Sequence, residues 1–235
     1  MSTGMHGLGV AALCWLVLSA SSTAQAEQQV WRFDNLSRIG GFKVEVEGAP
    51  KLIASPVGAA LSFDGAGDSV LVDGRPLVGA SAFTVEVVVR PDGGAFAQRF
   101  MHIAETNPAT GLDTSATGPD RNGRLMFEVR VEDDAWALDV FANSASGSRP
   151  LLFMDHPHPL GRWYVVTQTY DGKTYRAYVD GVLQGEGGLA FTPHGPGRVR
   201  VGARMNRVDY FRGAIALARF TDRALPPEDF LKISQ

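Results

Sequence analysis

The chain has 235 residues, a formal net charge of −3 and 20% charged residues, with both signs scattered along the sequence. A chain without a basic block lacks the surface that nucleic acid or an anionic membrane would attract, so neither is expected as a partner. The single cysteine excludes a disulfide within the chain and a cysteine-based metal site.

The first 26 residues have the composition of a cleavable secretory signal. They contain no Asp, Glu, Lys or Arg, and an apolar run at 10–18 precedes the small-residue motif Ala24-Gln25-Ala26. This run is shorter than the roughly 20 apolar residues of a membrane-spanning helix, although an N-terminal membrane anchor is the alternative. We therefore predict a signal peptide at 1–26 and a secreted or periplasmic mature chain that does not insert into a membrane.

The cysteine, Cys14, lies within this apolar run. A lipoprotein would have a small residue immediately before its lipidated cysteine, whereas Leu13 stands here, so lipidation is not expected. The mature chain would contain no thiol, and its hydrophobic core must hold the domain together. Residues 27–235 have the length of one all-β domain.

Strand-like patterns dominate these residues, because short β-branched or alternating apolar runs recur between Gly, Pro, Asn and Asp. In chain order the runs are 29–34, 42–46, 60–63, 69–72, 83–90, 100–104, 124–131, 136–142, 163–170, 175–179, 198–201 and 213–220. No long helical period interrupts them, which predicts an all-β fold. A short helical turn is expected only at 226–233, where two prolines and the acidic Glu228 and Asp229 suit a helix N-terminus.

The segment 170–187, YDGKTYRAYVDGVLQGEG, has two Asp-Gly pairs between apolar runs. Asp-Gly supplies the positive φ that tight hairpin turns require, so we predict that this hairpin is scaffold. By contrast, segments 106–123 and 143–162 are long and rich in Gly, Pro, Ser, Thr and Asn. We predict both as loops that lie beside a ligand.

Four blocks of the sequence share a pattern: ALSFDGAGDSVLVD at 60–73, FTVEVVVRP at 83–91, HPLGRWYVVTQTYDGKTYRAYVDGVL at 158–183 and VRVGARMNRVDYFRGAIALARFTDRAL at 199–225. Their order and spacing resemble the laminin-G-like jelly rolls of the concanavalin A-like lectin/glucanase superfamily, over most of residues 27–235. One departure is Tyr164-Val165 after Trp163, where the family often has His-His.

The resemblance implies one domain in which two antiparallel sheets pack face to face as a jelly roll sandwich. The expected core residues are Phe83, Val85, Val87, Val89, Trp163, Val165, Ile215 and Leu217. The resemblance does not choose a function, because such domains bind glycans, proteins or calcium, and some relatives are glycoside hydrolases or polysaccharide lyases.

A glycosidase needs two carboxylates facing one bond, and the glucanase relatives place theirs at alternating positions of one strand. The nearest pattern here is FEVRVEDD at 127–134, in which Arg130 separates Glu128 from Glu132 on the same face. This arrangement is typical of a solvated or concave sheet face. Glu128 and Arg130 remain candidate ligand contacts.

A polysaccharide lyase needs a base and a cation or amide that neutralises a uronate carboxylate. In QRFMHIAE at 98–105, strict alternation places Arg99 on the face of Met101 and Ile103 and places His102 on the opposite face. His102 is then either a hydrogen-bonded histidine of the sheet or a site residue, and Arg99 is a further candidate.

The segment GARMNRVDYFRG at 202–213 gathers arginines, an asparagine and a tyrosine between two strands. Arg204, Asn206 and Tyr210 suit the binding of sugar hydroxyls or carboxylates, and equally a structural role, whereas Arg212 is expected to be structural.

No histidine cluster has zinc spacing. Asp64, Asp68 and Asp73 lie near glycine-rich turns whose carbonyls would join them around calcium, although their role as turn residues is the simpler interpretation. No cofactor is therefore predicted with certainty, and calcium is left open.

The favoured interpretation is an exported carbohydrate-binding module with a glycan site on its concave face. The alternatives are a polysaccharide lyase or glycoside hydrolase and a protein-adhesion domain, so catalysis is left undecided. The candidate ligand-binding residues are Arg99, His102, Glu128, Arg130, Arg204, Asn206 and Tyr210.

Overall fold

The computed structural model describes residues 1, 27–107, 109–111, 113 and 123–234. The predicted signal sequence at 2–26, with Cys14, and much of the predicted loop at 106–123 lie outside these described residues. Within them the regular elements are strands and one 3-10 turn, which confirms the all-β prediction. No helix in this part of the chain is long and apolar enough to cross a bilayer.

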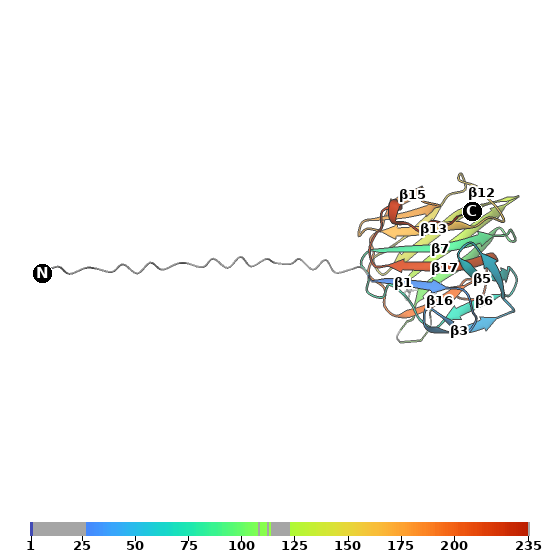
Figure 1. The fold of residues 1–235 in the computed structure, drawn as a ribbon, viewed down its shortest axis with the longest axis horizontal. Coiled ribbons are helices and arrows are strands. Elements are labelled where there is room, and N and C mark those ends of the chain that lie inside the picture. Colours follow the sequence, from blue (N-terminus) through green and yellow to red (C-terminus); the bar gives the residue numbers. More distant parts are fainter. Residues whose placement is uncertain (2–26, 108, 112, 114–122, 235) are drawn as a thin grey trace.

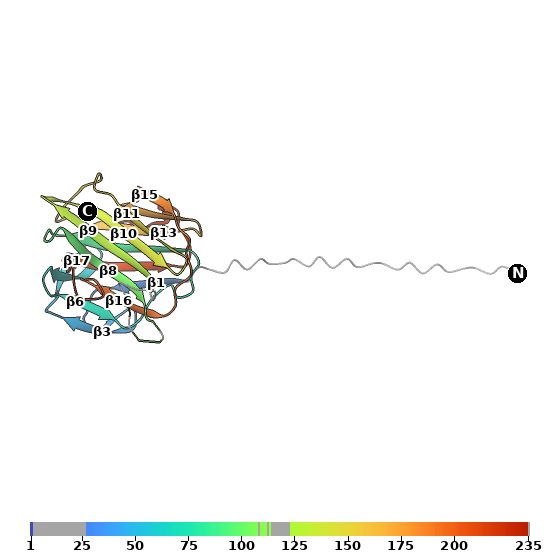
Figure 2. The ribbon, with the colours of Figure 1, turned by 180° about the vertical axis from the view of Figure 1, so that it is seen from behind.

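The strands of the described residues form two antiparallel sheets that pack face to face as a jelly roll sandwich (Figures 1 and 2). The β7 sheet, in front in Figure 1, contains, in spatial order, β15 (Val182–Gly188), β14 (Thr174–Val179), β13 (Tyr164–Tyr170), β7 (Phe83–Pro91), β17 (Arg212–Thr221), β5 (Gly58–Asp64) and β4 (Lys51–Ser55), and β1 (Gln28–Arg32) also pairs with β17. The β9 sheet, in front in Figure 2, contains β11 (Gly147–Leu152), β10 (Ala135–Ser144), β9 (Arg124–Glu132), β8 (Ala97–Glu105), β16 (Gly197–Val201), β6 (Ser69–Val72), β3 (Phe42–Glu47) and β2 (Arg38–Ile39), and β12 (His158–Pro159) also pairs with β10.

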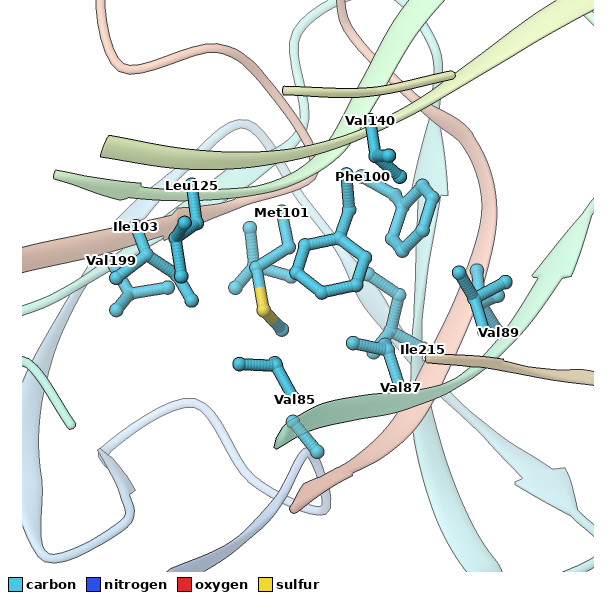
Figure 3. Packing of buried hydrophobic residues seen from close by; sticks show 14 of the residues in the cluster. Val85, Val87, Val89, Phe100, Met101, Ile103, Leu125, Val140, Val199 and Ile215 are labelled. Atoms are coloured by element: carbon cyan, nitrogen blue, oxygen red, sulfur yellow. The ribbon is translucent and has the colours of Figure 1, made fainter. Parts of the chain in front are cut away.

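The hydrophobic core lies between the two sheets, because alternate residues of facing strands point toward one another. In Figure 3, Val85 and Val87 of β7 approach Met101 and Ile103 of β8 across the space between the sheets. Each fully buried aliphatic side chain of this kind stabilises the fold by about 1.5–3 kcal/mol relative to an exposed one. The predicted core residues found here are Phe83, Val85, Val87, Val89 and Ile215.

The other three predicted core residues lie on the opposite side of the β7 sheet. Val165 and Leu217 are buried there in a second apolar cluster. Trp163 is half-buried against that cluster, and its ring centre lies 5.3 Å from the guanidinium carbon of Arg90. Val165 and Leu217 are thus confirmed as buried core residues, in a second cluster, whereas the prediction that Trp163 is a core residue is wrong because its side chain is only half-buried. In β13 it is Tyr164 and its alternate residues that point inward.

The C-terminal segment covers this outer face of the β7 sheet. Leu231 and Ile233 pack against the second apolar cluster, and Phe230 packs edge-on against Tyr178 with ring centres 5.0 Å apart. A 3-10 turn at Pro227–Asp229 directs the segment across the sheet, which confirms the predicted helical turn. The central strands of the β7 sheet are thus covered on both faces.

Every predicted strand run overlaps an observed strand, whereas β2, β4, β11, β12 and β15 are not among the predicted runs. The prediction of a loop throughout 143–162 is wrong, because β11 and β12 pair with β10. Gly147 and Pro150 hide the strand pattern of β11, and both are tolerated because this strand lies at the sheet edge.

The hairpin at 170–187 has the turn contacts expected of a scaffold. The Asp171 carboxylate accepts the backbone N–H groups of Lys173 and Thr174 at 2.9 and 2.7 Å. Asp180 and Gly181 form the next turn with φ of 49° and 78°. These contacts explain the Asp-Gly pairs without a ligand.

Candidate functional site

The candidate residues of β9 lie on the outer face of the β9 sheet, the face turned away from the β7 sheet. Phe127 and Val129 point into the core, so Glu128 and Arg130, which alternate with them, point outward. The candidates of β8 and of the loop after β16 lie on or beside this same face.

A β-bulge in β8 changes the predicted alternation. The register with β9 shifts between Arg99 and Met101, and both Phe100 and Met101 enter the core. Arg99 and His102 therefore share the outer face, so the prediction that places them on opposite faces is wrong. Strict alternation fails because a bulge inserts one extra residue into the strand.

Arginines and carboxylates form an ion network on this outer face. Glu128 Oε2 accepts a hydrogen bond from Arg130 Nη2 at 3.0 Å and forms an ion pair with Arg99 Nη2 at 2.9 Å. Arg130 Nη2 also pairs with Asp139 Oδ2. Asp139 lies directly opposite Glu128 in the β9–β10 hairpin and is missing from the predicted set. The network fixes the position of the Arg130 guanidinium.

The environment of Asp139 favours its protonated form. Burial raises the pKa of Asp139 to about 6 and the Glu128 carboxylate adds to the rise, whereas Arg130 and Arg99 oppose it. Two carboxyl groups in unlike environments are also a feature of glycosidases. Here, however, one oxygen of each carboxyl already binds the Arg130 guanidinium, so neither carboxyl is free to contact a substrate through that oxygen.

His102 lies on this face but has no exposed surface. Its Nδ1 accepts the backbone N–H of Met205 at 3.2 Å, and its Nε2 has no hydrogen-bond partner among the described residues. Burial holds the pKa of His102 well below its usual value, and four nearby arginines lower it further. His102 is therefore a neutral imidazole beneath Met205 and does not reach a ligand directly in this structure.

The loop at 202–211 carries the remaining candidates. Asn206 is exposed, whereas Arg204 and Tyr210 are half-buried. Arg204 lies close enough to His102 to lower the pKa of that imidazole. The loop thus presents one candidate fully to solvent and the other two only in part.

Asp209 fixes this loop to β8. Its carboxylate pairs with Arg99 Nη1 at 2.9 Å, and its carbonyl oxygen accepts the backbone N–H of Arg99 at 2.9 Å. Asp209 and Arg207 both adopt left-handed backbone conformations, with φ of 54° and 60°. Such conformations cost non-glycine residues about 1 kcal/mol or more, so the surrounding contacts must hold the loop in this shape.

A cavity of about 280 Å³, which we call the Arg130 cavity, lies beside the ion network. Met154 and Pro157, from the segment between β11 and β12, give it an apolar wall. The ring centre of Phe96 lies 6.0 Å from the Arg130 guanidinium carbon. The volume is near the lower end of the range of about 300–1,000 Å³ that is typical of ligand pockets. The lining residues are Arg130, Glu132, Asp133, Ala135, Trp136, Ala137, Met154 and Pro157.

A second cavity, of about 380 Å³, contains none of the predicted site residues. Its lining residues are Glu27, Gln29, Arg75, Leu77, Val78, Gly79, Ala80, Phe220 and Asp222. Behind it, the buried Arg75 donates through Nη2 to His194 Nδ1, and His194 Nε2 donates to the carbonyl oxygen of Asn143 at 2.7 Å. Burial lowers the pKa of His194 to about 4, and the Arg75 charge contributes to this shift.

Two of the three predicted calcium ligands, Asp64 and Asp68, serve as turn residues in the structure. Asp64 Oδ1 accepts the backbone N–H groups of Ala66, Gly67 and Asp68 at 2.8, 3.0 and 3.1 Å. Asp68 Oδ1 accepts the backbone N–H of Ala49 at 2.6 Å. No group of three or more His, Cys, Asp or Glu side chains among the described residues is arranged to hold a metal ion. Calcium binding stays a prediction.

A family model described as "Concanavalin A-like lectin/glucanases superfamily" (Laminin_G_3) matches residues 64–229. The chain belongs to this superfamily. The matched residues include the whole Arg130 cavity and every predicted site residue. The resemblance in the sequence is therefore confirmed. No curated protein matches the chain.

Solved structures share this superfamily fold at low sequence identity. Domain 4 of AbnA, an extracellular arabinanase from Geobacillus stearothermophilus solved with arabinotriose, matches with a TM-score of 0.60 and 17% identity over 86% of this chain and 96% of that one. The receptor binding domain of botulinum neurotoxin D matches with a TM-score of 0.58 and 12% identity, over 86% of this chain and 50% of that one. Trypanosoma rangeli sialidase, solved with the inhibitor DANA, matches with a TM-score of 0.56 and 17% identity, over 85% of this chain and 31% of that one. This chain thus spans nearly all of the arabinanase domain but half or less of the other two chains.

Proposed function

We propose that this chain is an exported carbohydrate-binding module whose glycan occupies the Arg130 cavity on the outer face of the β9 sheet. One observation carries the proposal: a guanidinium held by two carboxylates lies in the same cavity as the apolar wall of Met154 and Pro157. A fixed donor suits sugar hydroxyls, and an apolar wall suits the C–H face of a sugar ring. The superfamily and the arabinanase domain solved with arabinotriose support this choice.

Export to the periplasm or the exterior is part of the same proposal. Its support is the pattern of residues 1–26, in which an apolar run without charged residues precedes a small-residue cleavage motif. A glycan-binding module has its ligands outside the cytoplasm, so the two parts of the proposal agree.

A panel of neutral and acidic oligosaccharides tests the proposal, with calorimetry for binding and assays of new reducing ends and unsaturated products for cleavage. We expect binding without products. Met154→Ala should weaken binding by about 1–2 kcal/mol, because it removes part of the apolar wall. Val182→Ala is the matched control, since Val182 is 64% exposed on the other sheet. If no oligosaccharide binds, or if Met154→Ala binds as tightly as the wild type, the proposed site is wrong.

A polysaccharide-acting enzyme is the second candidate, because Glu128 and Asp139 are opposed on adjacent strands. Product formation that disappears in Asp139→Asn would favour this candidate. A protein partner is the third, because Met205 fills the face above His102 instead of leaving a groove there. Capture of a defined protein partner, together with failure of the whole sugar panel, would favour adhesion.

A further inference from the structure

The Arg130 cavity carries more negative than positive charge. Glu132 and Asp133 belong to its lining and are exposed. Arg130 is the one cation among the lining residues that the structure describes. Its guanidinium is already paired with the carboxylates of Glu128 and Asp139, and Glu128 also pairs with Arg99 outside the lining. A ligand in this cavity therefore meets an excess of negative charge.

The turn between β9 and β10 places the two exposed carboxylates beside the cavity. Glu132 and Ala135 are paired across the hairpin, and Asp133 adopts a left-handed backbone with φ of 52°. The backbone N–H of Leu160 also bonds to the carbonyl oxygen of Asp134 at 3.3 Å. These contacts fix the backbone of the turn, so both carboxylates start from fixed positions at the rim of the cavity.

Carboxylates at the rim of a cavity favour one class of sugar over another. Carboxylate oxygens accept hydrogen bonds and cannot donate them, so they bind the hydroxyl groups of a neutral sugar. A uronate, sialate or sulfate would meet like charge. In water, one unit charge about 4 Å from another changes the affinity roughly fivefold, and salt reduces this effect.

We infer that the Arg130 cavity selects neutral, hydroxyl-rich sugar residues and excludes acidic ones. This inference rests on the proposed function, because it assigns the ligand class of the same cavity. Arg130 then serves as a positioned donor to a hydroxyl oxygen and does not neutralise an anionic ligand, since Glu128 and Asp139 already balance its charge. Met154 and Pro157 contact the sugar ring.

Calorimetry on the full mature chain tests the inference with arabinotriose, xylotriose, maltotriose and mannotriose as neutral probes, and with trigalacturonate and sialyllactose as acidic probes. At least one neutral probe should bind, and each acidic probe should bind more weakly. The double variant Glu132→Gln/Asp133→Asn should strengthen the binding of the acidic probes by about five- to twentyfold. The control Asp222→Asn/Glu228→Gln removes the same charge from exposed positions outside the cavity and should leave that binding unchanged.

The outcomes separate this inference from the proposed function. If an acidic probe binds the wild type more tightly than every neutral probe, glycan binding stands but the inferred selectivity is wrong. If the cavity variant and the control variant change acidic binding equally, the selectivity does not arise from this cavity. If neither class of probe binds, the proposed function is wrong, and the inference that rests on it is wrong as well.

Discussion

Acid should destabilise this protein through His194. The imidazole is 3% exposed, its Nε2–H donates to the carbonyl of Asn143 at 2.7 Å, and its Nδ1 accepts from Arg75. Burial is the main cause that lowers the folded-state pKa of His194 from 6.5 to about 4, and the Arg75 guanidinium that faces Nδ1 adds to this shift. The stability that the neutral form contributes is complete above pH 6.5 and is lost as the pH falls toward 4. The difference of 2.5 pKa units corresponds to about 3 kcal/mol.

Urea unfolding of the wild type and of His194→Gln, at intervals from about pH 4 to pH 8, measures this loss. Glutamine keeps a donor and an acceptor but does not titrate, so the stability gap between the two proteins should shrink by about 3 kcal/mol from pH 7 to pH 4. His156→Gln is the control, because the His156 side chain is 43% exposed. Parallel profiles for wild type and His194→Gln, or an NMR titration of His194 near its usual pKa, would refute the reasoning.

Three further predictions concern pH, packing and processing. The pH dependence of stability that Asp139 causes has the opposite sign to that of His194. The pKa of Asp139 rises from 3.8 to about 6, so its contribution to stability is complete below pH 3.8 and is lost as the pH rises through 6. Asp139→Asn should therefore gain up to about 3 kcal/mol relative to the wild type between pH 4 and pH 7 in urea unfolding, and a constant difference would contradict this. Trp136→Ala should lower the free energy of unfolding by about 3–5 kcal/mol, because Trp136 is 1% exposed. Trp163→Ala should lower it by less than half as much, because Trp163 is half-buried. Equal losses of stability in the two variants would show that Trp163 is a core residue. Intact-mass measurement of the exported protein should give a chain that starts near Glu27, and a mass that retains residues 10–18 would contradict the signal prediction.

Apolar periodicity was enough to predict the all-β class, because the strands of the sandwich bury one or both faces, whereas the two-sheet jelly roll was predicted from the family resemblance. In FTVEVVVRP the apolar Phe83, Val85, Val87 and Val89 alternate with other residues and enter the core, while Val88 on the opposite face is buried in the second apolar cluster. Periodicity failed where backbone geometry departs from strict alternation. The β8 bulge placed Arg99 and His102 on one face, and Pro150 disguised the edge strand β11.

The candidate site was predictable only in part. Glu128 and Arg130 stood out because charged residues alternate with core residues in one strand. Asp139 could have been found from the hairpin register, since a turn at 133–134 pairs Glu132 with Ala135 and thereby Glu128 with Asp139. The apolar wall of the Arg130 cavity was beyond sequence reasoning, because Met154 reaches it through tertiary packing of a segment predicted as loop.

The cover over the outer face of the β7 sheet gives the two sides of the sandwich unequal freedom to evolve. Within the described residues, Val88 and Leu217 are enclosed beneath Leu231 and Ile233, so a charged substitution there would disrupt packing as severely as one between the sheets. Glu132, at the rim of the β9 sheet, is exposed and can change at little cost to stability. New binding specificity is therefore expected to arise on the β9 sheet, while the β7 sheet preserves the domain.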